Sequence, residues 1–232
     1  MQNIIAIQGN KNSGKDEFAR MLQFVLSTPK IFHKYWIYKH LNKLFPKQYK
    51  IVRYADKIKE ILSTLLNVPL YLFENREFKE KCYVDFNTLK LTHFDNIENS
   101  EKILSDSKFS REIKRLDKNL TKNYYLSIRQ LLQYFGTEIM RHYFGNNLWI
   151  LTTFKNQHEK LIISDQRFIN ENDVATKNNA FIIHITRPGV IAGNHSSESE
   201  LVQLFLDCKY DILLENDGTL KDLFNKAVQI VQ

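Results

Sequence analysis

Short, continuously apolar runs alternate with amphipathic segments along most of the chain. The runs have the length of buried strands and lie at residues 3–8, 50–54, 161–164, 181–186 and 211–215. Apolar residues recur at three- and four-residue intervals elsewhere and predict helices at residues 15–27, 55–67, 126–143, 147–157, 168–178, 198–206 and 219–231. Continuous apolar strands separated by helices predict a parallel sheet that is covered by helices on both faces.

Two segments depart from this alternation. Residues 28–49 are basic and aromatic, and we expect them to be an insertion that is helical in part. Residues 83–124 are rich in Asn, Lys, Asp and Ser, and their weak periodicity indicates a lid-like insertion. The 232 residues are therefore interpreted as one α/β domain with two insertions and a lid at about residues 187–200.

The first predicted strand leads directly into a glycine loop, IAIQGNKNSGKDEF, at residues 5–18. Gly9, Gly14 and Lys15 match the phosphate-binding pattern G-x-x-x-x-G-K, which requires this order of strand, glycine turn and helix. The glycines let backbone N–H groups turn toward phosphate oxygens, and the positive end of the following helix adds to them. The loop therefore predicts a nucleotide site, with Lys15 as the cation for the outer phosphates and with Lys11 at the crest.

Asp16 stands where the pattern has a Ser or Thr hydroxyl. Its carboxylate could coordinate Mg²⁺, directly or through water, or could stabilise the helix N-terminus. Asp165 ends another apolar strand, where a carboxylate could position Mg²⁺, hold a sugar hydroxyl or cap the strand. Arg167 follows two residues later and could clamp a phosphate or lie on the surface.

The predicted helix at 126–143 carries a polar stripe opposite its apolar face. The stripe consists of Arg129, Gln133, Gly136, Thr137 and Met140. A glycine inside a helix lowers stability by about 1 kcal/mol relative to alanine, so Gly136 indicates close approach of a ligand or another backbone. Arg129 is then a candidate for a substrate phosphate, with an ordinary solvated face as the alternative.

Three further groups are weaker candidates. Arg76 and Lys79 lie one helical turn apart and could grip an anion or form a surface pair. Arg187 lies just past a predicted strand and could act from a mobile lid as arginine fingers do. Ser197-x-x-Glu200 has the pattern of a capping box. We interpret the neighbouring His195 as a residue that forms a local hydrogen bond and not as a catalytic residue.

Composition narrows the class of protein. Cys82 and Cys208 are the two cysteines, and their spacing argues for a reducing compartment and against a disulfide scaffold or zinc site. The apolar run 4–7 is too short for a signal peptide, and no run approaches the roughly 18 residues of a membrane span. The net charge of +7 keeps nucleic-acid binding open, although a site for two polyanionic ligands also favours basic residues.

Several motifs occur in an order that resembles the deoxynucleoside-monophosphate kinases of tailed phages and large DNA viruses. They are G-x-K-x-S-G-K-D (9–16), Y-A-D-x-I-K (54–59), R-E-x-K (76–79), R-Q-L-L-Q-x-x-G-T-E (129–138), Trp149, S-D-x-R-x-x-x-E (164–171), H-I-T-R-P-G (184–189), H-x-S-E (195–198) and N-D-G-T-L-x-D-L (216–223). The resemblance implies a three-layer P-loop fold similar to adenylate kinase, with ATP and a deoxynucleoside monophosphate as substrates and Mg²⁺ as cofactor. It also implies phosphoryl transfer by positioning and charge neutralisation, with lid closure excluding water.

The residue patterns above and the resemblance together assign roles to individual residues. ATP would be held by Gly9, Lys11, Asn12, Ser13, Gly14, Lys15, Asp16, Glu17, Asn216 and Gly218. The deoxynucleotide would be held by Arg76, Lys79, Arg129, Gln133, Gly136, Thr137, Trp149, Asp165, Arg167 and Glu171. Lys15, Arg129, Arg167 and Arg187 would be catalytic, and Asp16 and Asp165 would hold Mg²⁺.

Glu17 departs from the resemblance, because the family has a hydroxyl residue at this position. Two adjacent carboxylates at a phosphate site predict strong Mg²⁺ dependence. The alternatives left open are a kinase for another small acceptor, such as dephospho-coenzyme A, and a nucleotide-dependent nucleic-acid-binding module. We expect a cytoplasmic protein (in the host cytoplasm or viral factory if it is viral) and a possible homodimer. No membrane partner is expected, and nucleic acid is disfavoured as a partner.

Overall fold

The computed structural model describes residues 2–85, 90–93, 125–155, 160–190 and 196–232. The chain forms two compact units, Met1–Tyr54 with Asn146–Gln232 (unit 1) and Ala55–Gly145 (unit 2), and each is described by itself. The organisation into one domain with two insertions and a lid stays a prediction.

Unit 1 contains a five-stranded sheet in the order β2-β6-β1-β7-β8, and every neighbouring pair is parallel. Its strands are β1 (Ile4–Gly9), β2 (Lys50–Val52), β6 (Leu161–Gln166), β7 (Phe181–Thr186) and β8 (Ile212–Glu215). In register, Ile5 of β1 lies between Ile162 of β6 and Phe181 of β7. The predicted strands and the parallel sheet are confirmed, and all five carboxyl ends lie at one edge.

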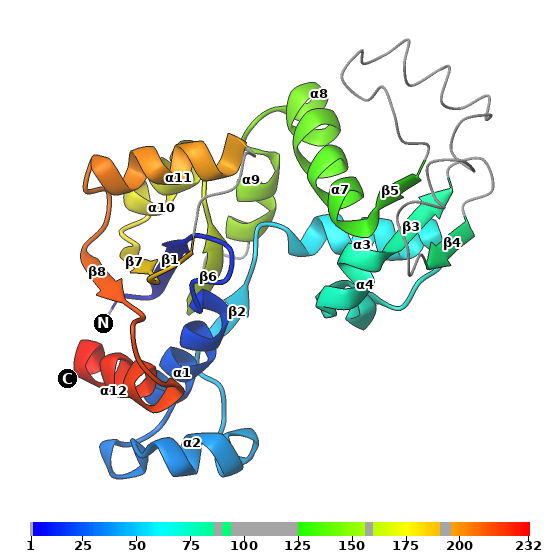
Figure 1. Ribbon diagram of the computed structural model, residues 1–232. Coiled ribbons are helices and arrows are strands. Elements are labelled where there is room, and N and C mark those ends of the chain that lie inside the picture. The colour runs from blue at the N-terminus through cyan, green and yellow to red at the C-terminus, as the bar shows by residue number, and fades with distance from the viewer. Residues whose placement is uncertain (1, 86–89, 94–124, 156–159, 191–195) are drawn as a thin grey trace. The chain divides into compact units, whose positions relative to one another are not determined.

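Helices cover both faces of this sheet and give the predicted three layers. They are α1 (Lys15–Ser27), α9 (Leu148–Phe154), α10 (Ile169–Lys177), α11 (Ser196–Leu206) and α12 (Leu220–Val231). Figure 1 shows α1 and α12 on one face and α10 and α11 on the other. Phe18 and Leu22 of α1 are fully buried in a core with Ile5 and Phe224. Each such side chain contributes about 1.5–3 kcal/mol through burial.

The basic segment, residues 28–50, belongs to unit 1 and is helical in part, as predicted. It forms η1 (Lys30–Phe32), α2 (Tyr35–Leu41) and η2 (Asn42–Leu44). Tyr38 is buried, with its ring centroid 5.6 Å from that of Phe24 on α1 and 5.4 Å from that of Phe224 on α12. Such aromatic pairs add about 0.5–1.5 kcal/mol beyond area burial, so the segment is fastened to the core.

Unit 2 combines helices with a small antiparallel sheet of order β4-β3-β5. Its elements are α3 (Asp56–Leu66), η3 (Leu70–Glu74), α4 (Arg76–Lys81), β3 (Cys82–Asp85), β4 (Lys90–His93), β5 (Tyr125–Ser127), α7 (Ile128–Gln133), η4 (Tyr134–Arg141) and α8 (His142–Phe144). The sequence did not predict this sheet, because residues 83–124 lack a clear period. Most of that segment, residues 94–124, lies outside the described residues.

The predicted helix at 126–143 needs two corrections. Leu126 pairs with Val84 in the antiparallel sheet, so the helix begins at Ile128, where the Ser127 hydroxyl accepts a hydrogen bond from Gln130 N. Residues Tyr134–Arg141 then form a π-helix, whose wider turn does not preserve the 3.6-residue period. The polar stripe deduced from that period therefore does not hold along the whole segment.

Candidate nucleotide-binding site

The glycine loop connects β1 to α1 at the carboxyl edge of the parallel sheet. Gly14 has φ of 95°, in the left-handed region that glycine adopts without strain. A Cβ atom at Gly9 would lie 2.4 Å from the carbonyl oxygen of Ile185, so only glycine fits beside β7. Asn12 also has positive φ, and Ser13 N donates to Asn10 O. The sequence thus forms the predicted turn, which leads straight into the N-terminus of α1.

Asn216 holds the loop from the end of β8. Its side chain is buried and its Nδ2 donates to the carbonyl oxygen of Ser13 at 2.9 Å, while its own N–H donates to Thr186 O. A Cβ atom at Gly14 would lie 2.4 Å from this Nδ2. This amide thus supports the backbone of the loop, and the assignment of Asn216 to ATP stays a prediction. Gly218, also assigned to ATP, is exposed just before α12.

Two polar groups inside the loop are suited to an anion. The Lys15 side chain is buried, and its Nζ donates to Asn10 O at 3.0 Å. Ser13 Oγ is also buried and has no hydrogen-bond partner within the described part of the chain. A buried hydroxyl without a partner is unfavourable, and a phosphate oxygen would accept its hydrogen bond. Lys11 is half-buried at the crest of the loop.

Asp16 lies in the first turn of α1 with its carboxylate half exposed. The Ser164 hydroxyl of β6 donates to Asp16 Oδ1 at 3.4 Å, and Arg53 Nε lies 3.3 Å from the same oxygen. Sequence reasoning missed Arg53 and Ser164, although both lie at carboxyl ends of predicted strands. Arg53 and Ser164 directly precede Tyr54 and Asp165 of the quoted motifs, and this position could have identified them as site residues.

Asp165 accepts a hydrogen bond from Tyr54 N at 2.8 Å, which ties the chain after β2 to β6. The strand does not end at Asp165 as predicted but continues to Gln166, because parallel pairing with β1 extends that far. The structure thus brings Asp16 and Asp165 to the same edge of the sheet.

The donor chemistry of this edge fits Mg²⁺. Asp16, Ser164 and Asp165 offer carboxylate and hydroxyl oxygens, the hard ligands that Mg²⁺ prefers. Among the described residues there is no cluster of three or more His, Cys, Asp or Glu that could enclose a metal. An ion bound by one or two carboxylates, waters and phosphate oxygens, as Mg²⁺ commonly is, needs no such cluster.

Glu17 has different partners from its neighbour Asp16. Its Oε2 accepts from Arg20 at 2.7 Å and its Oε1 accepts from the Tyr38 hydroxyl at 2.6 Å. Burial, followed by the hydrogen bond to Glu17, raises the pKa of Tyr38, so the phenol stays protonated as the donor. The Glu17 carboxylate therefore links α1 to α2, a role that neither the loop pattern nor the resemblance indicated.

Glu171 is buried in the first turn of α10. Its Oε2 accepts from the backbone N–H groups of Arg167 and Phe168 at 2.8 and 3.0 Å. Glu200 of α11 accepts from Ile169 N at 2.9 Å, so two carboxylates bind N–H groups at and just before the N-terminus of α10. The backbone that carries Arg167 is thereby fixed at the carboxyl edge of β6.

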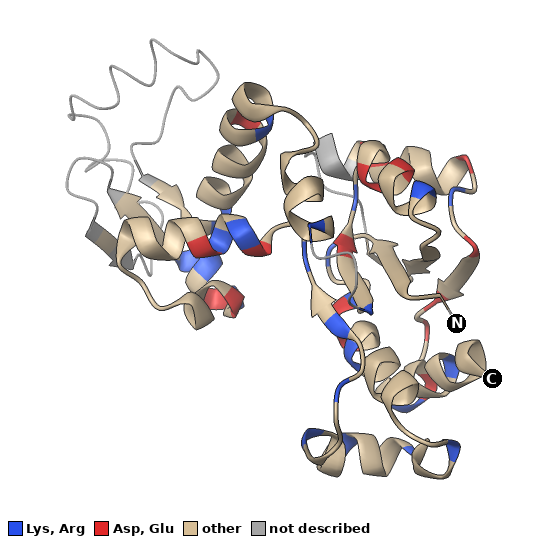
Figure 2. Cartoon of the chain, turned by 180° about the vertical axis from the view of Figure 1, so that it is seen from behind, with Lys and Arg blue, Asp and Glu red and all other residues tan. Residues whose placement is uncertain are grey.

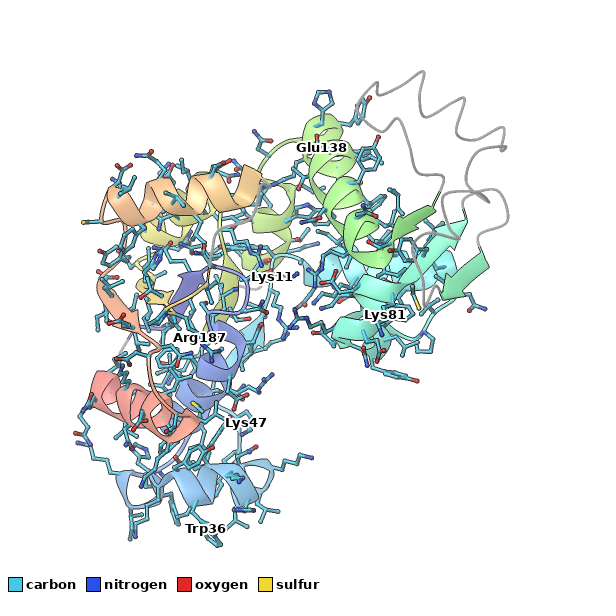
Figure 3. The ribbon with its side chains drawn as sticks, in the orientation of Figure 1. Lys11, Trp36, Lys47, Lys81, Glu138 and Arg187 are labelled. Carbon is cyan, nitrogen blue, oxygen red and sulfur yellow. The ribbon has the colours of Figure 1, made fainter. Side chains whose placement is uncertain are left out.

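The other predicted residues of unit 1 have contrasting surroundings. Trp149 of α9 is buried, whereas Arg187 is exposed directly after β7 (Figure 3). His195 and part of the predicted lid lie outside the described residues. Their assigned roles stay predictions.

Arg129 of unit 2 forms an ion pair with Glu80, with its Nε 2.7 Å from Glu80 Oε1. Glu80 was not predicted as a partner. A Cβ atom at Gly136 would lie 2.6 Å from Ile58 Cδ1, so this glycine permits close packing of η4 on α3. The remaining assigned residues of unit 2 are the half-buried Lys79, Gln133 and Thr137 and the exposed Arg76.

The parallel sheet, the glycine loop and the helix that follows it define a P-loop protein of the α/β class. The family model of deoxynucleotide monophosphate kinases matches residues 3–227. The chain therefore belongs to the deoxynucleotide monophosphate kinase family.

Relatives from large viruses and phages support this placement. A protein of Acanthamoeba polyphaga mimivirus is 33% identical over 119 residues, which are 44% of this chain and 60% of that protein. The deoxynucleotide monophosphate kinase of Enterobacteria phage T4 is 30% identical over 108 residues, 43% of each chain. The matches thus span about half the length of these relatives.

Among solved structures, the chain is similar to dephospho-CoA kinase from Campylobacter jejuni, at 17% identity and a TM-score of 0.38. This comparison covers 100% of this chain and 96% of that one. Separately, no helix in the described part of the chain is long and apolar enough to cross a membrane.

Proposed function

We propose that the protein transfers the γ-phosphoryl group of ATP to deoxynucleoside monophosphates and so forms the diphosphates. The family match over residues 3–227 is the observation that carries this proposal. The glycine loop supports it, because Lys15, the Ser13 hydroxyl and the N-terminus of α1 converge where polyphosphate oxygens would need donors.

In this proposal, ATP binds with its phosphates in the loop and draws the Lys15 ammonium from Asn10 O to the outer phosphates. Asn216 keeps the loop carbonyl of Ser13 in place and so preserves the direction of the neighbouring N–H groups. Such donors, oriented before the substrate arrives, stabilise the charge that develops during transfer without reorganising.

Mg²⁺ would be held by Asp16, with Asp165 as a second oxygen ligand. Bound there, the ion would neutralise phosphate charge. Arg53 near Asp16 offsets the repulsion between this carboxylate and a triphosphate.

The acceptor phosphate is already anionic, so its attack on the γ-phosphoryl group requires no general base. Catalysis then consists of in-line positioning and charge neutralisation. We assign the neutralising charges to Lys15, Arg129, Arg167 and Arg187. Arg187 is exposed, as expected of a residue that reaches its substrate after lid closure.

The acceptor assignments rest on the resemblance of the motifs. In unit 1 the fixed backbone at Arg167 supports a role for this side chain as a phosphate clamp. In unit 2 the pairing of Arg129 with Glu80 holds the guanidinium in one orientation, which suits bidentate binding of a phosphate. A homodimer and a cytoplasmic location, in the host cytoplasm or viral factory if the protein is viral, remain part of the proposal.

The proposal is tested by measuring acceptor-dependent release of ADP with each deoxy- and ribonucleoside monophosphate in turn. We expect turnover with at least one deoxynucleoside monophosphate that exceeds turnover with its ribose counterpart. Dephospho-coenzyme A is the control acceptor, and preference for it would replace the proposed substrate class. ATP binding without acceptor-dependent turnover would favour a nucleotide-dependent binding module.

A further inference from the structure

The basic segment, residues 28–50, carries positive charge and no negative charge. The proposed kinase reaction does not use this surface. No acidic residue occurs between Glu17 and Asp56, whereas the basic segment contains six lysines. Figure 2 shows α2 and its flanks with blue positions and no red ones. This charge pattern attracts a polyanion.

Four of these lysines, Lys30, Lys34, Lys39 and Lys43, are exposed and form no ion pair within the described residues. Lys47 differs, because it donates to Asn42 O and lies over the Phe24 ring, 5.9 Å from its centroid. The four exposed ammonium groups are therefore available to phosphate groups in solution.

Trp36 lies among these lysines on α2 and is 63% exposed. Its ring lies 5.4 Å from that of His40, one turn further along the helix, and Figure 3 shows Trp36 directed away from the core. Ile31 and Leu44, on either side of α2, are exposed as well. An exposed aromatic ring flanked by cations is the combination on which single-stranded nucleic acids stack.

The opposite side of α2 is rigidly attached. Tyr38 is buried among Phe24 and Phe224, and its hydroxyl donates to Glu17. The surface therefore exists before a ligand binds, which reduces the entropy lost on binding.

We propose that residues 30–44 form a binding surface for single-stranded nucleic acid, with Trp36 as the stacking platform and Lys34, Lys39 and Lys43 as phosphate contacts. A duplex fits less well, because its bases are already stacked and offer no face to Trp36. An anionic membrane also fits less well: α2 spans about 10 Å, and its buried face leaves only isolated apolar side chains for insertion.

The test measures binding of a fluorescein-labelled oligothymidylate to the full chain, with saturating ADP and deoxynucleoside monophosphate present, a pair between which no γ-phosphoryl group can be transferred. These nucleotides occupy the kinase site and keep the oligonucleotide out of it. We expect Trp36→Ala to weaken binding roughly tenfold, through loss of one stacked base. We expect Lys34→Glu, Lys39→Glu and Lys43→Glu combined to weaken it further and to lower the slope of log affinity against log salt by about two.

The matched control reverses three exposed lysines elsewhere in unit 1, Lys155, Lys177 and Lys221, and so has the same net charge. Thermal unfolding of every variant verifies that it folds. Equal loss of affinity in the control would overturn the proposal, because bulk charge would then explain binding. No binding of the oligonucleotide while nucleotides occupy the kinase site would also overturn it.

The fluorescence of Trp36 distinguishes binding of single-stranded nucleic acid from binding of an anionic membrane. The second tryptophan, Trp149, is buried, and a Trp149→Phe background leaves Trp36 as the only reporter. Quenching by oligothymidylate supports base stacking. A blue shift with phosphatidylserine vesicles, and no change with oligothymidylate, would identify a membrane surface and overturn the proposal.

Discussion

The Tyr38 hydroxyl donates a hydrogen bond of 2.6 Å to Glu17 Oε1. This contact joins the first turn of the phosphate-loop helix to α2 and gives the Glu17 carboxylate a structural role. The adjacent Asp16 instead meets Ser164 and Arg53. The two neighbouring acids are therefore distinct in their surroundings, which changes the expected source of any Mg²⁺ dependence.

We expect Asp16→Asn to raise the Mg²⁺ concentration needed for half-maximal turnover by about tenfold or more, because a ligand carboxylate is lost. Glu17→Gln is the matched control and should leave that concentration unchanged. It should instead lower the melting temperature, since the ion pair with Arg20 is lost. Titration of turnover with Mg²⁺ measures both effects. Equal shifts in the two variants would mean that both acids act on the metal, as the sequence pattern first suggested.

We expect Asn216→Ala to impair ATP binding more than acceptor binding. The substitution removes the hydrogen bond to Ser13 O, which contributes about 0.5–1.5 kcal/mol and positions the loop. The KM for ATP should rise several-fold while the KM for the monophosphate changes little. Asp217→Asn, at the exposed neighbouring residue, is the control. An unchanged KM for ATP would show that the loop keeps its conformation without this support.

Arg129→Ala is predicted to raise the KM for the monophosphate more than the KM for ATP, because we assign the guanidinium to the acceptor phosphate. Glu80→Gln removes the charge of its partner and leaves Arg129 present. The Glu80 variant should therefore show a smaller rise. An equal rise of the KM for the monophosphate in both variants would contradict this role, as would an equal rise of both KM values in Arg129→Ala. Either result would mean that Arg129 stabilises the structure of unit 2 instead.

His184 makes stability sensitive to acid. Burial lowers its pKa to about 4, whereas a histidine in an unfolded chain has a pKa of about 6.5. The unfolded state therefore binds more protons between these values, and the free energy of unfolding falls as pH decreases through this window.

His184→Phe keeps a ring beside Phe205 and Tyr210 and removes this titration. Urea unfolding at a series of pH values in this window measures the free energy of unfolding of both proteins. Its slope against pH should be smaller for the variant, by an amount that corresponds to at most one bound proton. An identical dependence in the two proteins would assign the acid sensitivity to other groups.

The sequence was most informative where one strong pattern decided the structure. Continuous apolar runs identified all five parallel strands, and the helix at 15–27 was predicted with the bounds it has in α1. The helix at 126–143 was less well predicted. Cross-strand pairing of Leu126 moved its start, and the π-helix at Tyr134–Arg141 altered its period.

The sequence predicted where several site residues lie in the fold. It did not predict which residues they form hydrogen bonds with. The loop pattern located Lys15 and Asp16 at a strand end, where parallel sheets bind ligands. It did not indicate that Asn216, distant in sequence, holds Ser13, or that Glu17 binds Tyr38. Such contacts depend on tertiary packing between segments, and no local period or spacing records them.

The central claim is that this chain forms a deoxynucleoside diphosphate from ATP and the monophosphate. The most direct test is chromatographic detection of that product from purified wild-type protein and from Lys15→Ala, with folding of both verified by thermal unfolding. The account predicts product with the wild-type protein and at least a thousandfold less with the variant, in line with typical losses of a charge-stabilising group. Equal product from both proteins, or none from the wild type with any deoxynucleoside monophosphate, would contradict it.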